Sequence, residues 1–213
     1  MPAMKISVIL LAGGTGSRMG TSVPKQFLDI HGKPIASYSF DLFSNLSYVS
    51  QIVVVAPPAY RELFPGALYA DPGERRQDSV YNGFQETSRG VDLVCIHDAS
   101  RPFLQKEDVD KLLSIAIECK AAALGRPILY TVKEVRGDTV LRTIDRSTLW
   151  EVHTPQMIAP DLLAEGFKHA YAHNLTVTDD VSLIEHIGHP VKLVEGSGRN
   201  VKLTTPDDMA LIR

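Results

Sequence analysis

The sequence of 213 residues contains little cysteine, no long apolar run and no excess of positive charge. Two cysteines, Cys95 and Cys119, are too few for a disulfide framework and are typical of buried thiols in a reducing compartment. No segment approaches the roughly 20 consecutive apolar residues of a membrane span. The apolar run near the N-terminus, about six residues long, is also too short for the hydrophobic region of a signal peptide. These absences favour a cytoplasmic protein that does not bind a membrane.

The charge balance limits the partners that we expect. The formal net charge is −3 and the pI is about 6.2, so the chain has no general attraction for nucleic acid or an anionic membrane. Affinity for phosphate would have to come from a local cluster of cations. Because 44% of the residues are hydrophobic, the chain can bury a full core, and we expect one domain over residues 1–213.

The segment 10–27, LLAGGTGSRMGTSVPKQF, is the most informative part of the chain. An apolar strand expected at 6–11 leads into a glycine-rich turn that carries two cations, Arg18 and Lys25. Glycines accept backbone conformations that other residues avoid, and they let main-chain N–H groups approach an oxyanion. A guanidinium fork and a compact ammonium group suit a polyphosphate. We therefore predict a phosphate-binding loop, the alternative being a tight turn with solvated charges. The glycines concerned are Gly13, Gly14, Gly16 and Gly20.

The same segment does not fit a dinucleotide-binding dehydrogenase. That fingerprint requires G-x-G-x-x-G, and an acidic residue after the second strand to bind the ribose hydroxyls. Here Gly14, Gly16 and Gly20 give G-x-G-x-x-x-G, and the strand expected at 51–56 is followed by two prolines. Both requirements fail.

Apolar runs rich in β-branched residues alternate with helical patterns along the chain. This alternation predicts an α/β fold, a Rossmann-like, mostly parallel sheet with helices on both faces. One expected helix begins at Thr178, whose hydroxyl would cap it, and another begins after Thr205. We expect strands at 6–11, 51–56, 67–70, 91–96, 121–124 and 191–194, and helices near 34–45, 76–87, 107–119, 160–171, 179–187 and 206–212.

Residues 128–153 break this pattern. They alternate like two antiparallel strands around the turn at 136–138, which predicts a projecting β-arm. Such an arm has too little core to be stable alone, so its apolar side chains must bury against something. We expect a second copy of the chain in a two-fold dimer; the alternative is that the arm folds back on its own domain. The apolar positions are Val132, Val135, Val140, Leu141, Ile144, Leu149 and Trp150.

Polar and charged side chains follow several of the expected strands. In an open parallel sheet, ligands bind outside the carboxyl ends of the strands, near the point where the strand order reverses. Besides the glycine-rich turn, the segments 71–79, 97–102 and 196–202 each carry cations or hydrogen-bonding side chains. We expect all four to converge on one rim of the sheet.

The motifs along this rim resemble those of the 2-C-methyl-D-erythritol 4-phosphate cytidylyltransferase family of the non-mevalonate isoprenoid pathway, from about residue 6 to 212. The matching motifs are LAGGTGSRMG…PKQF at 11–27, RQDSV at 76–80, HDASRP at 97–102, DRSTLW at 145–150, TPQ at 154–156, TDDVS at 178–182 and NVKLTTPDD at 200–208. The resemblance implies transfer of CMP from CTP to a sugar-alcohol phosphate by in-line attack, with release of pyrophosphate.

The resemblance also implies roles for individual residues. Arg18 and Lys25 would stabilise the pentacoordinate phosphorus, while Arg146 and Lys202 would hold the acceptor phosphate. Arg146 lies on the expected arm and would act in the neighbouring subunit's site. Thr131, Thr154, Thr178, Asp98 and Arg101 match further acceptor contacts, Thr178 being first of all a helix cap. Ala12, Gly13, Gly14, Gly16, Gly73 and Ser79 match positions around the nucleotide.

Other positions stay open between two roles. Arg76 and Asp78 belong to the nucleotide motif, but they could equally brace the loop. Asp98 could sit near the metal instead of a polyol hydroxyl. Mg²⁺ is implied by triphosphate chemistry and would be held mainly by phosphate oxygens, so no cluster of metal ligands is expected. His97 is expected to brace its loop rather than to take part in the reaction.

Two alternative functions stay open beside this resemblance. The resemblance extends to a sister family that uses ribitol 5-phosphate as the acceptor. The DRSTLW segment favours methylerythritol phosphate over ribitol phosphate. The second alternative is a nucleotide sensor without catalytic activity, against which the presence of Arg18, Lys25 and Lys202 together argues.

Overall fold

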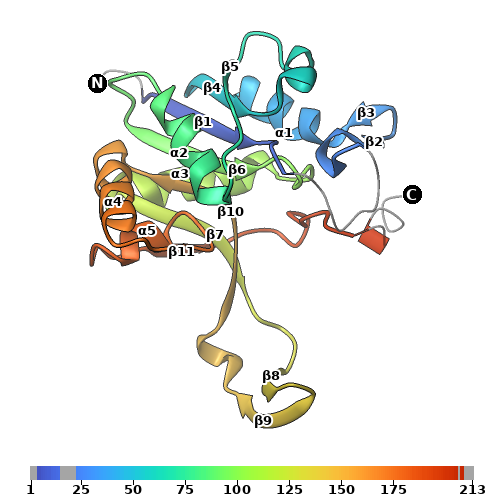
Figure 1. Ribbon diagram of the computed structural model, residues 1–213, viewed down its shortest axis with the longest axis vertical. Helices are drawn as coiled ribbons and strands as arrows, with labels where there is room; N and C mark the ends of the chain where they lie inside the picture. Colours follow the sequence, from blue (N-terminus) through green and yellow to red (C-terminus); the bar gives the residue numbers. More distant parts are fainter. Residues whose placement is uncertain (1–3, 15–22, 206, 209–213) are drawn as a thin grey trace.

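The computed structural model describes residues 4–14, 23–205 and 207–208. Its centre is a seven-stranded sheet in the order β11-β7-β10-β6-β1-β4-β5 (Figure 1). Only β10 runs antiparallel to its neighbours within this described sheet, so the expected mostly parallel, Rossmann-like arrangement is confirmed. The strands are β1 (Ile6–Leu11), β4 (Val49–Val55), β5 (Leu68–Ala70), β6 (Leu93–Asp98), β7 (Ala121–Pro127), β10 (Trp150–Ile158) and β11 (Lys192–Glu195).

Helices cover both faces of this sheet, as the alternating pattern predicts. Successive residues of a strand point to opposite faces, so Val8 packs with the cluster under α1 and α3, while Ile9 packs with the cluster under α2 and α4. The free cysteines also fit the prediction, since Cys95 is buried and Cys119 is half-buried. The helices are α1 (Ile35–Ser44), α2 (Arg76–Gln85), α3 (Lys106–Cys119), α4 (Pro160–Ala172) and α5 (Ser182–Glu185).

Strand β10 is the main element that the sequence analysis missed. It leaves the arm and enters the sheet between β6 and β7, pairing antiparallel with both. Its residues 154–158 are all buried, but Pro155 and the polar Gln156 are untypical of a central strand. The expected strand at 91–96 also lies two residues later, so that His97 and Asp98 are the last residues of β6 rather than part of the following loop.

The helix expected at 179–187 is also shorter than predicted. Helix α5 begins at Ser182, and the Thr178 hydroxyl does not cap it. The Asp179 carboxylate accepts the Ser182 amide instead, at 3.2 Å. The expected helix at 206–212 lies mostly outside the described residues.

The β-arm projects away from the sheet (Figure 1). Strands β8 (Val132–Arg136) and β9 (Thr139–Ile144) pair with each other around Gly137, whose φ of 61° lies in the left-handed region that glycine tolerates. Val135, Val140 and Leu141 remain 53%, 54% and 49% exposed. The alternative that the arm folds back on its own domain is therefore wrong.

The shorter elements lie around the edge of the sheet. Two-residue strands β2 (Asp29–Ile30) and β3 (Lys33–Pro34) form a small hairpin, and single-turn helices are η2 (Lys25–Phe27), η3 (Pro58–Leu63) and η4 (Arg146–Thr148). None of the helices in the described part of the chain has the length and apolar character needed to cross a membrane.

Candidate active site

A cleft of about 370 Å³ lies at the carboxyl ends of β1 and β6. The chain passes from β1 outward to β4 and β5 and then returns to β6 on the other side of β1, so this is the point where the strand order reverses. Four loops that are far apart in the sequence meet here, as the sequence analysis predicted. The predicted site residues that line the cleft are Gly13, Gly14, Lys25, Gly73, Arg76, Ser79, Asp98 and Lys202.

Two glycines permit close approaches beside the cleft, Gly13 between the loops after β1 and β5, and Gly73 between the loop after β5 and the start of α2. A Cβ atom on Gly13 would lie 2.6 Å from Pro72 Cγ, and one on Gly73 would lie 2.5 Å from Asp78 Cβ. Neither Gly13 nor Gly14 has a positive φ, so the expected special backbone conformation is not used at these two positions. Gly14 has no atom within 4 Å of its Cβ position. Gly16, Gly20 and Arg18 lie outside the described residues.

We predict that Gly13→Ala is destabilising, because the rigid Pro72 ring leaves no room for a methyl group. Forced overpacking of this kind costs about 1–3 kcal/mol, which should lower the Tm by several degrees in thermal unfolding. Gly14→Ala is the matched control for stability, because its Cβ would face open space. Equal Tm values for the two variants would contradict this account of the loop.

Gln26 holds the start of the glycine-rich loop by hydrogen bonds, a role that the sequence analysis missed. Its side chain is buried, and Nε2 donates to the carbonyl oxygens of Ala12 at 2.6 Å and Gly14 at 2.7 Å. Ala12 is itself fully buried, and its amide donates to the Val55 carbonyl. The signal for Gln26 was present in the PKQF motif, directly after Lys25.

Ion pairs centred on Asp98 organise the floor of the cleft. Oδ1 accepts hydrogen bonds from Arg76 Nε at 3.2 Å and Nη2 at 3.1 Å, and Oδ2 accepts from Lys202 Nζ at 2.6 Å. Burial alone would raise the pKa of Asp98, but the two cations outweigh burial and hold that pKa well below its usual range. Asp98 is therefore ionised at neutral pH and fixes two cations that come from opposite sides of the cleft.

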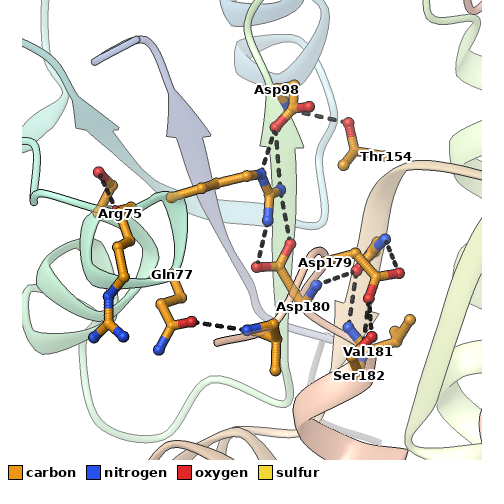
Figure 2. A network of polar contacts seen from close by, with 12 residues as sticks. Arg75, Gln77, Asp98, Thr154, Asp179, Asp180, Val181 and Ser182 are labelled. Atoms are coloured by element: carbon orange, nitrogen blue, oxygen red, sulfur yellow. Dashed lines mark hydrogen bonds and ion pairs between the residues drawn. The ribbon is translucent and has the colours of Figure 1, made fainter. Parts of the chain in front are cut away.

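Arg76 has a second carboxylate partner, Asp180, which the sequence analysis did not single out. Its Nη1 and Nη2 atoms each donate to one Asp180 oxygen at 2.9 Å, a bidentate geometry. Figure 2 shows the Asp98 and Asp180 carboxylates in this network, with Asp179 beside Asp180. Asp180 is buried, so the pair ties the nucleotide motif on α2 to the loop before α5. Asp78, in contrast, pairs with Arg75 at the start of α2, consistent with its bracing role.

Two buried glutamines hold the loop 175–181 in place (Figure 2). Gln77 donates to the Leu175 carbonyl at 3.1 Å and accepts the Val177 amide at 2.9 Å. Gln156 accepts the amides of Asp180 and Val181, both at 2.9 Å. Thr178 lies within this loop and does not line the cleft. Gln77 and Gln156 belong to the RQDSV and TPQ motifs, but no spacing rule predicted that they contact one loop.

The other predicted acceptor residues do not line this cleft. Arg101 is buried, with Nη1 donating to the Asn200 carbonyl at 2.8 Å. Thr154 is also buried, and its hydroxyl oxygen accepts the Asp98 amide at 3.0 Å (Figure 2). Thr131 and Arg146 are exposed on the arm, where Arg146 Nη1 donates to the Leu129 carbonyl.

The cleft offers few ligands for a metal ion. Glu74 and Asp98 are the carboxylates among its described lining residues, and both oxygens of Asp98 already accept hydrogen bonds from cations. No group of three or more metal-ligating side chains occurs in the described part of the chain. This set of donors suits Mg²⁺ only if phosphate oxygens and water provide most of its ligands.

Comparisons with known proteins agree on one family. A family model described as 2-C-methyl-D-erythritol 4-phosphate cytidylyltransferase matches residues 6–213. The chain is 47% identical over 215 residues to the chloroplastic protein of that name from Oryza sativa subsp. japonica, covering 97% of this chain and 72% of the relative. It is 40% identical over 210 residues to the Chlamydia pneumoniae protein of that name, covering 98% and 97%. The crystal structure of the Thermus thermophilus enzyme superimposes with a TM-score of 0.84 at 30% identity, covering 98% and 97%.

Proposed function

Because the chain belongs to the 2-C-methyl-D-erythritol 4-phosphate cytidylyltransferase family, we propose that its cleft transfers CMP from CTP to 2-C-methyl-D-erythritol 4-phosphate, with release of pyrophosphate. The observation that carries this assignment to the cleft is the convergence of Lys25, Arg76 and Lys202 with Gly13 and Gly14 around one space of about 370 Å³. Three cations from distant segments surround a volume where two phosphate groups can meet.

The chemistry requires this kind of electrostatic environment. An oxygen of the acceptor phosphate attacks the α-phosphorus of CTP in line, and the bond from that phosphorus to the bridging oxygen breaks as pyrophosphate leaves. Two anions are forced together, and negative charge grows on the bridging and non-bridging oxygens. Fixed cations stabilise this charge without reorganising during the step. The acceptor phosphate is already ionised, so no general base is needed.

We assign the cations by their position around the cleft. Lys25 follows the glycine-rich loop and would contact the triphosphate together with Arg18, which lies outside the described residues. Lys202 is held by Asp98 and would contact the acceptor phosphate. Arg76 is held by ion pairs with Asp98 and Asp180, which fix the position of its positive charge at the floor of the cleft.

The base of CTP would face the loop 73–79. The Gly73 amide donates to Ser79 Oγ at 2.9 Å, which fixes this loop as a short, closed turn beside the cleft. Small residues and backbone amides in this loop would leave room for a pyrimidine and would bind its polar edge. The triphosphate would then run along residues 12–25.

The acceptor site would be completed by the arm of a second copy. Leu129 and Tyr130 at the base of the arm are 63% and 83% exposed, and Val140 and Leu141 near its tip are also exposed. Burying these side chains against a partner in a two-fold dimer would recover their hydrophobic contribution. Arg146 and Thr131 of each subunit would then reach the neighbouring cleft.

Mg²⁺ is the metal ion that fits this reaction. It would lie mainly on the phosphate oxygens of CTP, with Glu74 or Asp98 as the protein carboxylates within reach of the cleft. When bound, it would neutralise charge on the triphosphate.

Pyrophosphate release tests the proposed function directly. With CTP and Mg²⁺, 2-C-methyl-D-erythritol 4-phosphate should support turnover, while ribitol 5-phosphate should give a kcat/KM lower by about 10- to 100-fold. EDTA should stop the reaction and added Mg²⁺ should restore it. CTP binding without pyrophosphate release for either acceptor would favour the nucleotide sensor instead.

A further inference from the structure

His97 is a fully buried side chain beside the candidate active site that the proposed reaction does not use. It precedes Asp98 at the end of β6, and its ring packs edge-on against Phe43 on α1. Burial lowers the pKa of His97 to about 3, so the imidazole is neutral at physiological pH. A neutral imidazole has one N–H donor and one nitrogen acceptor, and each needs a partner in the interior.

Both ring nitrogens of His97 have such partners. Nδ1 lies 3.2 Å from Thr154 Oγ1 on β10, and Nε2 lies 3.2 Å from Ser39 Oγ on α1 and 3.3 Å from the Arg101 carbonyl oxygen. Ser39 Oγ also donates to the Arg101 carbonyl at 3.1 Å. Three elements of the fold are therefore joined through one imidazole.

The direction of each hydrogen bond follows from the groups that can only donate or only accept. The Asp98 amide can only donate, so Thr154 Oγ1 accepts from it at 3.0 Å. The Thr154 hydroxyl proton then has His97 Nδ1 as its acceptor. Nε2 faces the Arg101 carbonyl, which can only accept, so Nε2 carries the imidazole proton. The opposite tautomer would leave the Thr154 proton without this acceptor and set a nitrogen lone pair against a carbonyl.

This chain of hydrogen bonds ends on the groups that shape the cleft. Through Thr154 it fixes the backbone of Asp98 (Figure 2). The Asp98 carboxylate in turn holds Arg76 and Lys202. Through the Arg101 carbonyl it fixes the loop 99–102, in which the Ser100 carbonyl accepts the Leu203 amide next to Lys202. Thr154 is only 4% exposed, and its single hydroxyl proton is already used.

We infer that Ser39, His97 and Thr154 form a buried hydrogen-bond relay that positions Asp98, and that Thr154 is a positioning residue rather than a contact for the acceptor. The expected effect of the relay on turnover rests on the proposed function, because the relay would influence turnover through Lys202 and Arg76, which Asp98 holds. The relay itself rests on the hydrogen bonds above.

A double-mutant cycle between Thr154 and Asp98 tests this inference. Thr154→Val keeps the side-chain shape but removes the hydroxyl, and it should lower kcat/KM about tenfold, the usual effect of one lost hydrogen bond. In the Asp98→Asn background the same change should alter kcat/KM by less than about twofold, because the relay acts through the Asp98 carboxylate. A direct contact between Thr154 and the acceptor predicts additive losses and a raised acceptor KM, which would overturn the inference.

Matched variants separate positioning from loss of folding. Thr154→Ser keeps the hydroxyl and should restore kcat/KM to within about twofold of the wild type; a loss as large as that of Thr154→Val would overturn the inference. Ser44→Ala removes a hydroxyl from the same helix as Ser39, where Ser44 bonds only the Phe40 carbonyl among the contacts described, and it should leave kcat/KM unchanged. Thermal unfolding and CTP binding would confirm that each variant is folded.

A measurement without turnover distinguishes failure of the relay from failure of the proposed function. ¹⁵N NMR of the histidine side chains in the wild-type protein should show His97 neutral and protonated on Nε2 throughout the pH range in which the protein is folded. A His97 signal from the Nδ1-protonated tautomer, or one that titrates near neutral pH, would overturn the relay. If His97 shows the Nε2 tautomer but the protein releases no pyrophosphate, the proposed function fails and the relay stands.

Discussion

Two variants that are each inactive, Lys25→Ala and Arg146→Ala, should recover activity when their subunits are mixed. Lys25 lines the cleft of its own subunit, whereas Arg146 is exposed on the projecting arm and does not line that cleft. In a dimer that exchanges arms, a mixed pair contains one cleft with its own Lys25 and a wild-type Arg146 from the neighbour. Random pairing of equal amounts would restore about a quarter of the sites.

Co-expression of two differently tagged chains, followed by purification over both tags, would isolate the mixed dimers for this measurement. The matched control is a mixture of Lys25→Ala with Lys202→Ala. Both of these residues belong to the same cleft, so each cleft of the mixed dimer lacks one cation and no activity should return. Full activity of Arg146→Ala alone, or recovery in the control mixture, would contradict the proposal that the arm completes the neighbouring site.

Loss of Lys202 should have the second large effect. Removing one preorganised charged group that acts on the transition state lowers kcat by about 10²- to 10³-fold, and we expect Lys202→Ala to fall in this range. Lys192→Ala on β11 removes the same charge from an exposed position and should leave kcat within about twofold of the wild type. Lys202→Arg should recover only part of the activity, because a guanidinium fork differs in shape from an ammonium group. A kcat for Lys202→Ala close to that of Lys192→Ala would contradict the assignment.

The same variant has a signature in acid unfolding. The pKa of Asp98 is lower in the folded protein than in the unfolded chain, so the folded state binds fewer protons. This stabilisation is fully present above about pH 4, the ordinary range of an aspartate, and is lost as the pH falls. Lys202→Ala removes one of the two cations that lower this pKa. The difference in unfolding free energy between wild type and variant should therefore shrink as the pH falls below about 4, whereas a difference independent of pH would argue against the Asp98–Lys202 pair.

The glycine-rich loop illustrates how far sequence patterns reach. Its position after β1 and its place in the cleft were predictable from an apolar run followed by glycines. The need for glycine at position 13 could not be predicted in this way, because it depends on Pro72. Pro72 is 59 residues away and is brought close by the pairing of β4 with β5. Local composition indicates that the backbone approaches something closely, but it does not identify the neighbour.

Strand β10 is an element that the sequence patterns did not predict. No strand was expected over residues 154–158, where polar Thr154 and Gln156 interrupt the apolar pattern, yet both side chains are buried. Each is satisfied by a tertiary partner, Thr154 by the Asp98 amide and Gln156 by the amides of the loop before α5. Buried polar groups are tolerated only when such partners exist, and these partners become visible only after the fold has formed.

By itself, the sequence determined the alternation of strands and helices, the glycine-rich turn and the charged residues at the strand ends, because these depend on the periodicity and chemistry of neighbouring residues. The tertiary structure decided which charges meet. Arg76 and Asp180 are 104 residues apart, and Lys202 lies 104 residues from Asp98. The strand order brings these side chains together, and no local pattern encodes that order, since it depends on how every strand and helix buries its apolar face at once.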